Sequence, residues 1–212
     1  MANMGARDAA KRAFDLVVLV LTAPVLLPLI GMVLAVIFVN QAVRREFGPL
    51  ILRETRITKG KRFPLYKLNM YRESARRDYM ENAPKFKEFG SFRFLQDDPN
   101  ALTLPGRLMK RYYLDELGQV FNVLLGHMSI VGPRPRLENE PISFEPPRQT
   151  MKTGVFCFVA NRWKTGRNTR LTYTDDEDYL ELYQTLPTAK LLWLDLMILR
   201  DGFKAIRTGK GL

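Results

Sequence analysis

Two adjacent carboxylates, Asp115 and Glu116, are the residues whose types and spacing best suit chemistry. They lie at the start of an apolar helical pattern, where the helix dipole and free N–H groups stabilise an anionic side chain. Such a carboxylate can act as a nucleophile toward phosphorus. A second acid beside it can help to hold Mg²⁺, which neutralises a diphosphate and its leaving group. Acid pairs also begin helices as ordinary caps, so the dipeptide alone leaves both roles open.

A second chemical feature is Arg134, which lies between Pro133 and Pro135 in the segment GPRP. Each proline fixes its own φ angle and biases the residue before it toward an extended conformation. Arg134 is therefore expected to be a stiff guanidinium that can contact a phosphate through two hydrogen bonds. The alternative is that GPRP is an ordinary rigid turn.

The helix that must position the acid pair is predicted from an apolar stripe at helical spacing, Leu114, Leu117, Phe121 and Leu124. Three polar residues, Asp115, Gln119 and Asn122, share another side of this helix. We expect Gly126 to end it.

The other predicted elements are short, which favours one α/β domain that is mostly helical with few short strands. Strand-like runs cover residues 63–66 and 154–160, and a charged helical pattern begins near Tyr71. We interpret residues 97–105 as a loop, 106–112 as a helix and 128–149 as a proline-rich loop. A C-terminal amphipathic helix, residues 191–212, suits either a membrane interface or packing on the core. The residues suited to an interface are Trp193, Arg200, Lys204 and Arg207 within it and Lys190 directly before it.

Residues 16–39 form an uncharged apolar segment of 24 residues, or about 36 Å as a straight helix. That length can span a bilayer and exceeds the apolar core of a secretory signal. Basic residues flank both ends (Arg7, Lys11, Arg12, Arg44 and Arg45), and the positive-inside rule would keep both ends cytoplasmic. Pro24 offers no N–H to the Val20 carbonyl, which the Thr22 hydroxyl or water could satisfy instead. A re-entrant hairpin broken at Pro24 and a tilted, kinked span both remain open.

The net charge of +11 is concentrated between Arg44 and Arg111, where 17 basic residues face 8 acidic ones. This block suits nucleic acid, an anionic bilayer surface or phosphorylated substrates. The sequence has no zinc spacing, RNA-recognition signature or arginine-rich repeat to favour nucleic acid. Cys157 and His127 are the only residues of their types, which excludes an internal disulfide and a multi-histidine metal site.

In combination, LDEL through NVLLGHMSIVGPRP resembles the bacterial sugar transferases called monotopic phosphoglycosyl transferases. These enzymes move a phosphosugar from a nucleotide diphosphate sugar to a polyprenyl phosphate. The opening KRAFDLVVLVLTAP is similar to the family's Lys-Arg, Asp and re-entrant proline, and WLDLMIL is similar to its C-terminal pattern. GPLILRETR keeps the family arginine as Arg56 but has Glu54 where the family has Gln, and FPLYKLNM keeps Lys67.

The resemblance implies a two-step mechanism on the cytoplasmic face of a bacterial inner membrane. Asp115 would attack the β-phosphate of a UDP-sugar and displace UMP, and polyprenyl phosphate would then collect the phosphosugar from Asp115. Glu116 would work with Mg²⁺, with both acids as metal ligands, while Arg134, Lys67 and Arg56 would contact phosphate. Residues 1–42 would form the re-entrant membrane helix and 43–212 the cytoplasmic catalytic domain. The implied role is the first membrane step of polysaccharide or glycoconjugate assembly by a possible homodimer, without nucleic acid.

The later half of the chain departs from this pattern. Where the family has Pro-Gly-Ile-Thr-Gly, the chain has TMKTG, which keeps only Thr153 and Gly154. The following family segment has no clean match, and Arg162 is the candidate for its arginine. We therefore expect a divergent member with preserved chemistry, whose sugar and nucleotide the sequence does not identify. The alternative is a non-catalytic, membrane-docked relative that acts as a scaffold.

Overall fold

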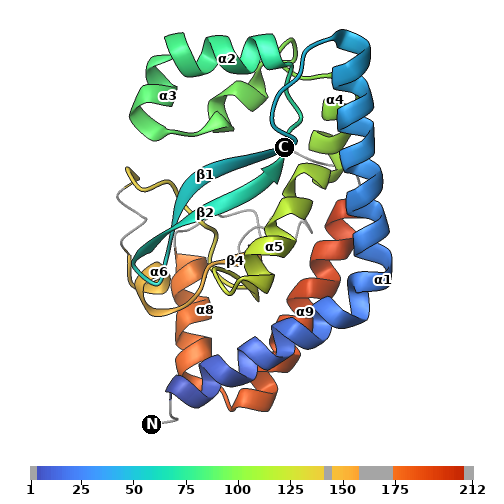
Figure 1. Ribbon diagram of the computed structural model, residues 1–212. Helices are drawn as coiled ribbons and strands as arrows, with labels where there is room; N and C mark the ends of the chain where they lie inside the picture. The colour runs from blue at the N-terminus through green and yellow to red at the C-terminus, as the bar shows by residue number, and fades with distance from the viewer. Residues whose placement is uncertain (1–3, 141–144, 158–173, 208–212) are drawn as a thin grey trace.

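The computed structural model of the chain describes residues 4–140, 145–157 and 174–207 (Figure 1). Its α-helices are α1 (Met4–Arg44), α2 (Glu73–Asn82), α3 (Pro84–Phe89), α4 (Leu104–Tyr112), α5 (Gln119–Leu124), α6 (Pro146–Thr150), α8 (Thr174–Thr185) and α9 (Thr188–Arg207). Two short 3-10 helices are η1 (Phe92–Asp97) and η2 (Leu114–Gly118), and the strands are β1 (Ile51–Thr58), β2 (Lys61–Leu68), β3 (Ser129–Val131) and β4 (Gly154–Phe156). The predicted mostly helical chain with few short strands is confirmed.

The strands form two small two-stranded sheets. β1 and β2 are an antiparallel hairpin whose turn residues, Lys59 and Gly60, both have positive φ angles, as a tight hairpin turn requires. β3 and β4 pair in parallel. The strand predicted at 63–66 is part of β2, and the one predicted at 154–160 is β4 as far as Phe156, while residues 158–160 lie outside the described residues.

Several predicted boundaries were wrong, and that of α4 has a local reason. α4 begins at Leu104 because Thr103 Oγ1 accepts a hydrogen bond from the Gly106 amide at 3.0 Å and Pro105 occupies the first turn. The predicted loop at 97–105 is therefore shorter. The predicted loop at 128–149 contains β3 and α6, and the acidic helix α8 was not predicted at all.

α1 is one bent helix that continues through Pro24 and Pro28 (Figure 1). The Thr22 hydroxyl donates to the Val18 carbonyl at 2.7 Å, so the expectation that it serves the Val20 carbonyl was wrong. The most apolar 18-residue window of α1 is only 11% buried, and the helix is long and apolar enough to cross a membrane. Its re-entrant placement in a bilayer stays a prediction.

Both arms of α1 pack on the same folded body. In the first arm, Lys11 Nζ forms an ion pair with Asp195 of α9 at 2.5 Å, and Asp15 accepts hydrogen bonds from Ser129 and from the Ile130 amide. The second arm buries Val33 and Ile37 in a hydrophobic cluster that includes Leu52, Leu68, Met70, Phe92 and Met109. α1 therefore connects two cores, the other of which is built mainly from β2, β3, α5, α8 and α9.

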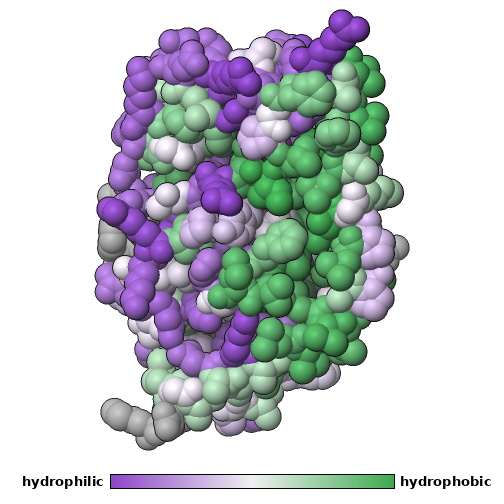
Figure 2. Space-filling view, in the orientation of Figure 1, coloured by the Kyte–Doolittle hydropathy of each residue, from purple (hydrophilic) through white to green (hydrophobic). Residues whose placement is uncertain are grey.

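The remaining face of α1 is exposed and apolar along its length. Its large exposed side chains are Leu16, Val17, Val20, Leu21, Val25, Leu27, Met32, Val36, Phe38, Val39 and Val43. Further exposed apolar residues lie on or beside α4, α5 and α9: Leu104, Leu108, Leu124, Leu125, Trp193, Leu196 and Phe203. We call these two sets together the apolar surface. In Figure 2 hydrophobic side chains gather over α1, while the opposite side of the view is hydrophilic.

Candidate active site

The acid pair lies in η2, directly after a left-handed residue. Tyr113 has a φ angle of 57°, which ends α4 and turns the chain into η2, so Asp115 is the second residue of a 3-10 helix. The α-helix predicted from Leu114 starts only at Gln119. Asp115, Gln119 and Asn122, which were predicted to share one side of a helix, are all buried.

A close approach between η2 and β2 brings Lys67 to Asp115. A Cβ atom on Gly118 would lie 2.8 Å from the Tyr66 carbonyl oxygen, so only glycine allows this distance. Asn122 fixes α5 to the same strand, since its side chain accepts from the Tyr66 amide at 2.9 Å and donates to the Pro64 carbonyl at 2.6 Å. These contacts set the position of the acid pair relative to β2.

Asp115 and Lys67 form a largely buried ion pair. The distance from Lys67 Nζ to Asp115 Oδ2 is 3.4 Å, and Asp115 is 5% exposed. Burial raises the pKa of Asp115 to about 6, although the positive charge of Lys67 opposes that shift. Burial alone would lower the pKa of Lys67, but the charge of Asp115 and two nearby glutamates raises it. The pair is thus a carboxylate that can ionise near neutral pH beside a charged lysine.

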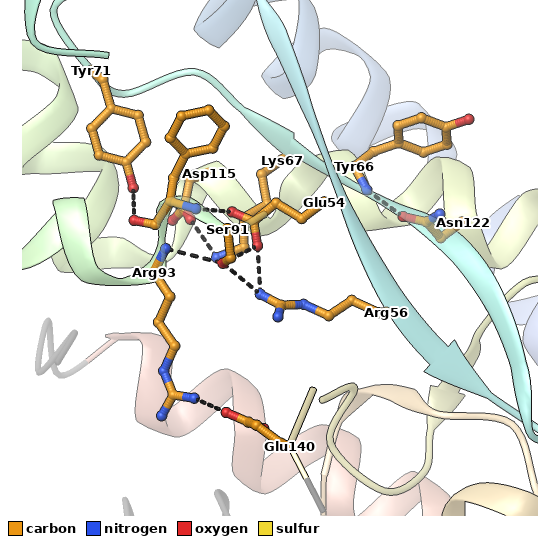
Figure 3. Close-up of polar contacts among 11 residues, drawn as sticks. Glu54, Arg56, Tyr66, Lys67, Tyr71, Ser91, Arg93, Asp115, Asn122 and Glu140 are labelled. Atoms are coloured by element: carbon orange, nitrogen blue, oxygen red, sulfur yellow. Dashed lines mark hydrogen bonds and ion pairs between the residues drawn. The ribbon is translucent and has the colours of Figure 1, made fainter. Parts of the chain in front are cut away.

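A second polar cluster, which Figure 3 shows beside the pair, surrounds Glu54 of β1. Arg56 Nη2 donates to Glu54 Oε2 at 2.5 Å, and the Ser91 hydroxyl donates to the same oxygen at 3.0 Å. The Phe92 amide donates to the other Glu54 oxygen at 3.2 Å. Arg56 is buried, and one of its terminal amino groups is directed to Glu54, so it stabilises this cluster as well as adding positive charge.

The GPRP loop lies beside the end of β1. The Ile57 amide donates to the Arg136 carbonyl at 3.3 Å, and Arg56 forms an antiparallel bridge with Leu137. Arg148 Nε donates to the Arg134 carbonyl at 3.0 Å, which helps to fix the loop backbone. The Arg134 side chain is exposed, and its charge contributes to lowering the pKa of Arg56, whose main cause is burial. Arg134 is thus a solvent-facing cation near the buried cluster.

Glu116 faces a different environment from Asp115. It is partly buried and lines an apolar pocket between α1, β4 and α9, together with residues such as Leu26, Val155 and Phe203. Its negative charge also raises the pKa of Asp115, so the two carboxylates remain electrostatically coupled. The acid pair therefore joins a polar side, at β2, to an apolar side, at α1.

The residues present fit a Mg²⁺ ion that shares its ligands with a substrate. No group of three or more acidic, histidine or cysteine side chains suited to a metal occurs within residues 4–140, 145–157 and 174–207. Mg²⁺ is commonly held by one or two carboxylates with substrate phosphates completing the shell. Asp115 and Glu116 are the two carboxylates that would hold such an ion, and a substrate phosphate would have to complete its ligands.

The structure brings together five of the predicted residues, Asp115, Glu116, Lys67, Arg56 and Arg134, and places Pro24 in α1. Arg162 lies outside the described residues. The interface residues Trp193, Lys190, Arg200 and Lys204 are exposed on α9, while the side chain of Arg207 is not described. Trp193 is 64% exposed whereas Leu191 and Ile198 are buried, so α9 packs on the core with one face and presents the other.

Sequence reasoning missed two members of the site, Glu54 and Ser91. The exchange of the family's glutamine for Glu54 was a visible signal, because a new buried acid needs a partner. Ser91 gave no signal, since it lies 37 residues away along the chain and begins η1 as an ordinary cap.

The sequence matches the bacterial sugar transferase family over residues 6–209. It is 36% identical over 135 residues to the undecaprenyl-phosphate galactose phosphotransferase of Salmonella typhimurium. This match covers 61% of this chain and 27% of that protein. It is 33% identical over 136 residues to the exopolysaccharide production protein ExoY of Sinorhizobium fredii. This match covers 62% of this chain and 58% of that protein. It is 28% identical over 211 residues to the UDP-N-acetylgalactosamine-undecaprenyl-phosphate N-acetylgalactosaminephosphotransferase of Aeromonas hydrophila. This match covers 95% of this chain and 44% of that protein.

The chain thus spans between about a quarter and three fifths of the length of these relatives. The family match, by contrast, includes nearly the whole chain and every site residue described above. The chain therefore belongs to the bacterial sugar transferase family.

Proposed function

We propose that this protein transfers a sugar 1-phosphate from a nucleotide diphosphate sugar, a UDP-sugar in the first instance, to polyprenyl phosphate. The observation that carries this proposal is the Asp115 carboxylate, buried at η2 and 3.4 Å from the ammonium group of Lys67. The names of the relatives, two of which are undecaprenyl-phosphate phosphotransferases, support this substrate class.

In the proposed first step, an Asp115 carboxylate oxygen attacks the β-phosphorus of the nucleotide sugar. The bond from that phosphorus to the bridging oxygen breaks, and UMP leaves with the electron pair. A phosphosugar remains as an acyl phosphate on Asp115. Lys67 is near enough to stabilise the negative charge that develops around the phosphorus, and Arg134 is an exposed cation available to the nucleotide phosphates.

In the second step, an oxygen of polyprenyl phosphate attacks the same phosphorus. The acyl phosphate bond breaks, which regenerates the Asp115 carboxylate and yields a polyprenyl diphosphate sugar. Mg²⁺ held by Asp115 and Glu116 would neutralise phosphate charge when bound. Together the two steps need a site that accepts one water-soluble and one lipid substrate, and the acid pair lies between a polar and an apolar side.

The same proposal places the protein on the cytoplasmic face of a bacterial inner membrane with α1 re-entrant. A straight span would carry one end of α1 about 30 Å away across the bilayer. Here both arms contact one folded body, through Lys11 and Asp15 in the first arm and Val33 and Ile37 in the second. The apolar surface, including Trp193, would then lie in the lipid interface.

The test is a panel of nucleotide sugars incubated with purified protein, Mg²⁺ and no lipid acceptor. We expect a nucleoside monophosphate to be released and one phosphosugar adduct to be mapped to Asp115 by mass spectrometry. Asp115→Asn should give neither product, because its side chain has no attacking charge. Glu116→Gln should be impaired but partly restored by higher Mg²⁺. Wild-type release of UMP by Asp115→Asn would refute the nucleophile, and no release with any nucleotide sugar would favour the scaffold alternative.

A further inference from the structure

Arg148 of α6 is a buried cation with no part in the proposed steps. The residue is 0% exposed, and a buried guanidinium costs free energy unless its charge and its N–H groups are paired. Nη2 forms an ion pair with Asp176 of α8, Nη1 lies 3.6 Å from Glu145 Oε2, and Nε donates to the Arg134 carbonyl at 3.0 Å. α6 lies beside α8 (Figure 1), so this one side chain joins α8 to the GPRP loop.

The contact with Arg134 controls how the Arg134 side chain leaves the backbone. Pro133 and Pro135 have no N–H groups, so at these two positions the backbone can be hydrogen-bonded only through its carbonyls. The Pro133 carbonyl, in the peptide plane before the Arg134 Cα, accepts from the Gly154 amide at 2.9 Å. The Arg134 carbonyl, in the plane after it, accepts from Arg148. Because both planes that meet at this Cα are held, the direction of its Cα–Cβ bond is fixed.

We propose that Arg148 is a positioning residue, which acts through the Arg134 carbonyl to hold the Arg134 guanidinium toward the phosphates of the donor. The inference rests on the proposed function, in which Arg134 is the exposed cation available to the nucleotide. Asp176 completes the arrangement, since Nε and the two Nη groups are coplanar and an acid on Nη2 sets the direction in which Nε donates. Through Asp176, α8 thereby takes part in holding the arginine at the phosphates.

Crowding of like charges explains why this support is needed. Burial lowers the pKa of Arg136, and the neighbouring charges of Arg148 and Arg134 lower it further. Glu140 and Asp176 act on it in the opposite direction. Three guanidinium groups therefore lie near one another, and their repulsion is offset by acids and by a fixed backbone. Apolar side chains could pack α6 on α8 without this crowding, so stability alone does not account for a buried cation here.

The first test is a double-mutant cycle on the binding of UDP with Mg²⁺, measured by isothermal titration calorimetry. UDP has both phosphates of the donor but no sugar to transfer, and the corresponding diphosphate replaces it if the panel of nucleotide sugars identifies another nucleoside. Arg148→Lys keeps a charge beside Asp176 but not the planar fork, and it should raise the Kd for UDP about tenfold, the effect of weakening one charge-assisted contact. In an Arg134→Ala background the same change should raise the Kd less than about twofold, because the contact is already absent.

Arg7→Lys is the matched control for the loss of a buried arginine. Arg7 is 4% exposed and also donates to backbone carbonyls, those of Tyr183 and Leu186, at and just after the other end of α8. Arg7→Lys should lower thermal stability but leave the Kd for UDP within about twofold of wild type, since it lies away from the GPRP loop.

A second variant removes the two buried charges together. Arg148→Met with Asp176→Leu leaves neither member of the pair without its partner, and apolar replacement of a buried ion pair is often neutral for stability. It should unfold at a temperature close to that of wild type and still raise the Kd for UDP about tenfold, since the Arg134 carbonyl loses its donor. This variant decides the question if Arg148→Lys does not fold.

The outcomes separate this inference from the proposed function. Equal fold-changes for Arg148→Lys in wild type and in Arg134→Ala, or wild-type affinity in the apolar pair, would overturn the positioning role and leave the function intact. The expected cycle on UDP without nucleotide release from any nucleotide sugar would refute the function and still support the positioning role. A wild-type protein that neither binds UDP nor releases a nucleotide would overturn both.

Discussion

At the scale of single residues, Asp115 must be ionised to attack, yet its surroundings oppose the charge. Burial raises the pKa of Asp115 to about 6, and Lys67 limits the rise. Below that pH the folded protein holds a proton on the nucleophile, so the rate of lipid-free nucleotide release should fall about tenfold per pH unit below about 6. Lys67→Met removes the opposing charge and should move this acid limb to higher pH. Lys67→Arg, which keeps the charge, should move it less.

The measurement is the single-turnover rate of nucleotide release from pH 4.5 to 8, with folding checked by circular dichroism at each pH. If the acid limb of the pH–rate profile lies at the same pH in Lys67→Met as in wild type, Lys67 does not control the ionisation of Asp115.

Arg134 should act on the substrate and not on the fold, because its side chain is exposed and its backbone carbonyl accepts a hydrogen bond from Arg148. Arg134→Ala should reduce turnover about a hundredfold, the usual loss for one charged contact to a phosphate, with unchanged thermal unfolding. Arg134→Lys should recover part of this, since a point charge cannot form two coplanar bonds. Arg62→Ala, which removes an exposed cation paired with Glu138, is the control. Full activity in Arg134→Ala would leave GPRP as a rigid turn.

The residues that carry proposed chemistry were predictable because their types are unusual in their settings. An acid pair at a helix start and an arginine between prolines are local patterns, and Lys67 came from the family resemblance. Glu54 and Ser91 were not predictable as a pair, because a contact across 37 residues leaves no local pattern. The different surroundings of Asp115 and Glu116 also depend on η2 being a 3-10 helix, which apolar spacing alone does not distinguish from an α-helix.

At the scale of elements, the site depends on the close packing of η2 against β2. Gly118→Ala would place a Cβ atom 2.8 Å from the Tyr66 carbonyl oxygen and 3.1 Å from Lys67 Cα. We expect it to push η2 away from β2, lower the free energy of unfolding by about 1–3 kcal/mol and reduce nucleotide release. Gly31→Ala is the matched control, because a Cβ there meets nothing within 4 Å.

Urea unfolding followed by tryptophan fluorescence, together with the nucleotide-release assay, measures both effects. Equal stability and activity in Gly118→Ala and Gly31→Ala would mean that this close approach does not position Asp115.

Element prediction succeeded where apolar periodicity or a cap was strong and failed where tertiary contacts decide. α4 and β2 were recognised from their patterns, and Gly126, with a φ angle of 78°, follows the end of α5 as expected. β3 is only three residues long and exists because β4 pairs with it. α8 is rich in acidic residues but buries Tyr179 and Tyr183 against the core, which its composition did not indicate.

At the scale of the whole molecule, the two ends of the sequence meet. Lys11, from the opening motif, pairs with Asp195, from the C-terminal motif, and Tyr179 donates to the same aspartate at 2.6 Å. The resemblance identified both motifs, but the contact between them depends on the fold of the entire chain. It fixes the first arm of α1 to α9 and thereby bears on membrane topology.

Tags at Met1 and at Leu212 should both be cytoplasmic, because the two arms of α1 are held on one body and basic residues flank each end. Pro24→Leu removes one cause of the bend but leaves the first arm held by Lys11 and Asp15. We therefore expect the N-terminus to stay inside in Pro24→Leu alone. It should become accessible from outside when Pro24→Leu is combined with Lys11→Met and Asp15→Leu, since the straighter helix, the release of its first arm and the loss of one flanking basic residue then favour a span.

Protease protection of the two tags in intact cells and in inverted vesicles measures this. Ala23→Leu combined with Lys11→Met and Asp15→Leu is the control, because it changes the neighbouring residue, keeps the proline and should leave the N-terminus inside. An N-terminal tag exposed outside in the unmodified protein would refute the re-entrant placement. It would also separate the two arms of α1 by a bilayer, which contacts of both arms with one folded body do not allow.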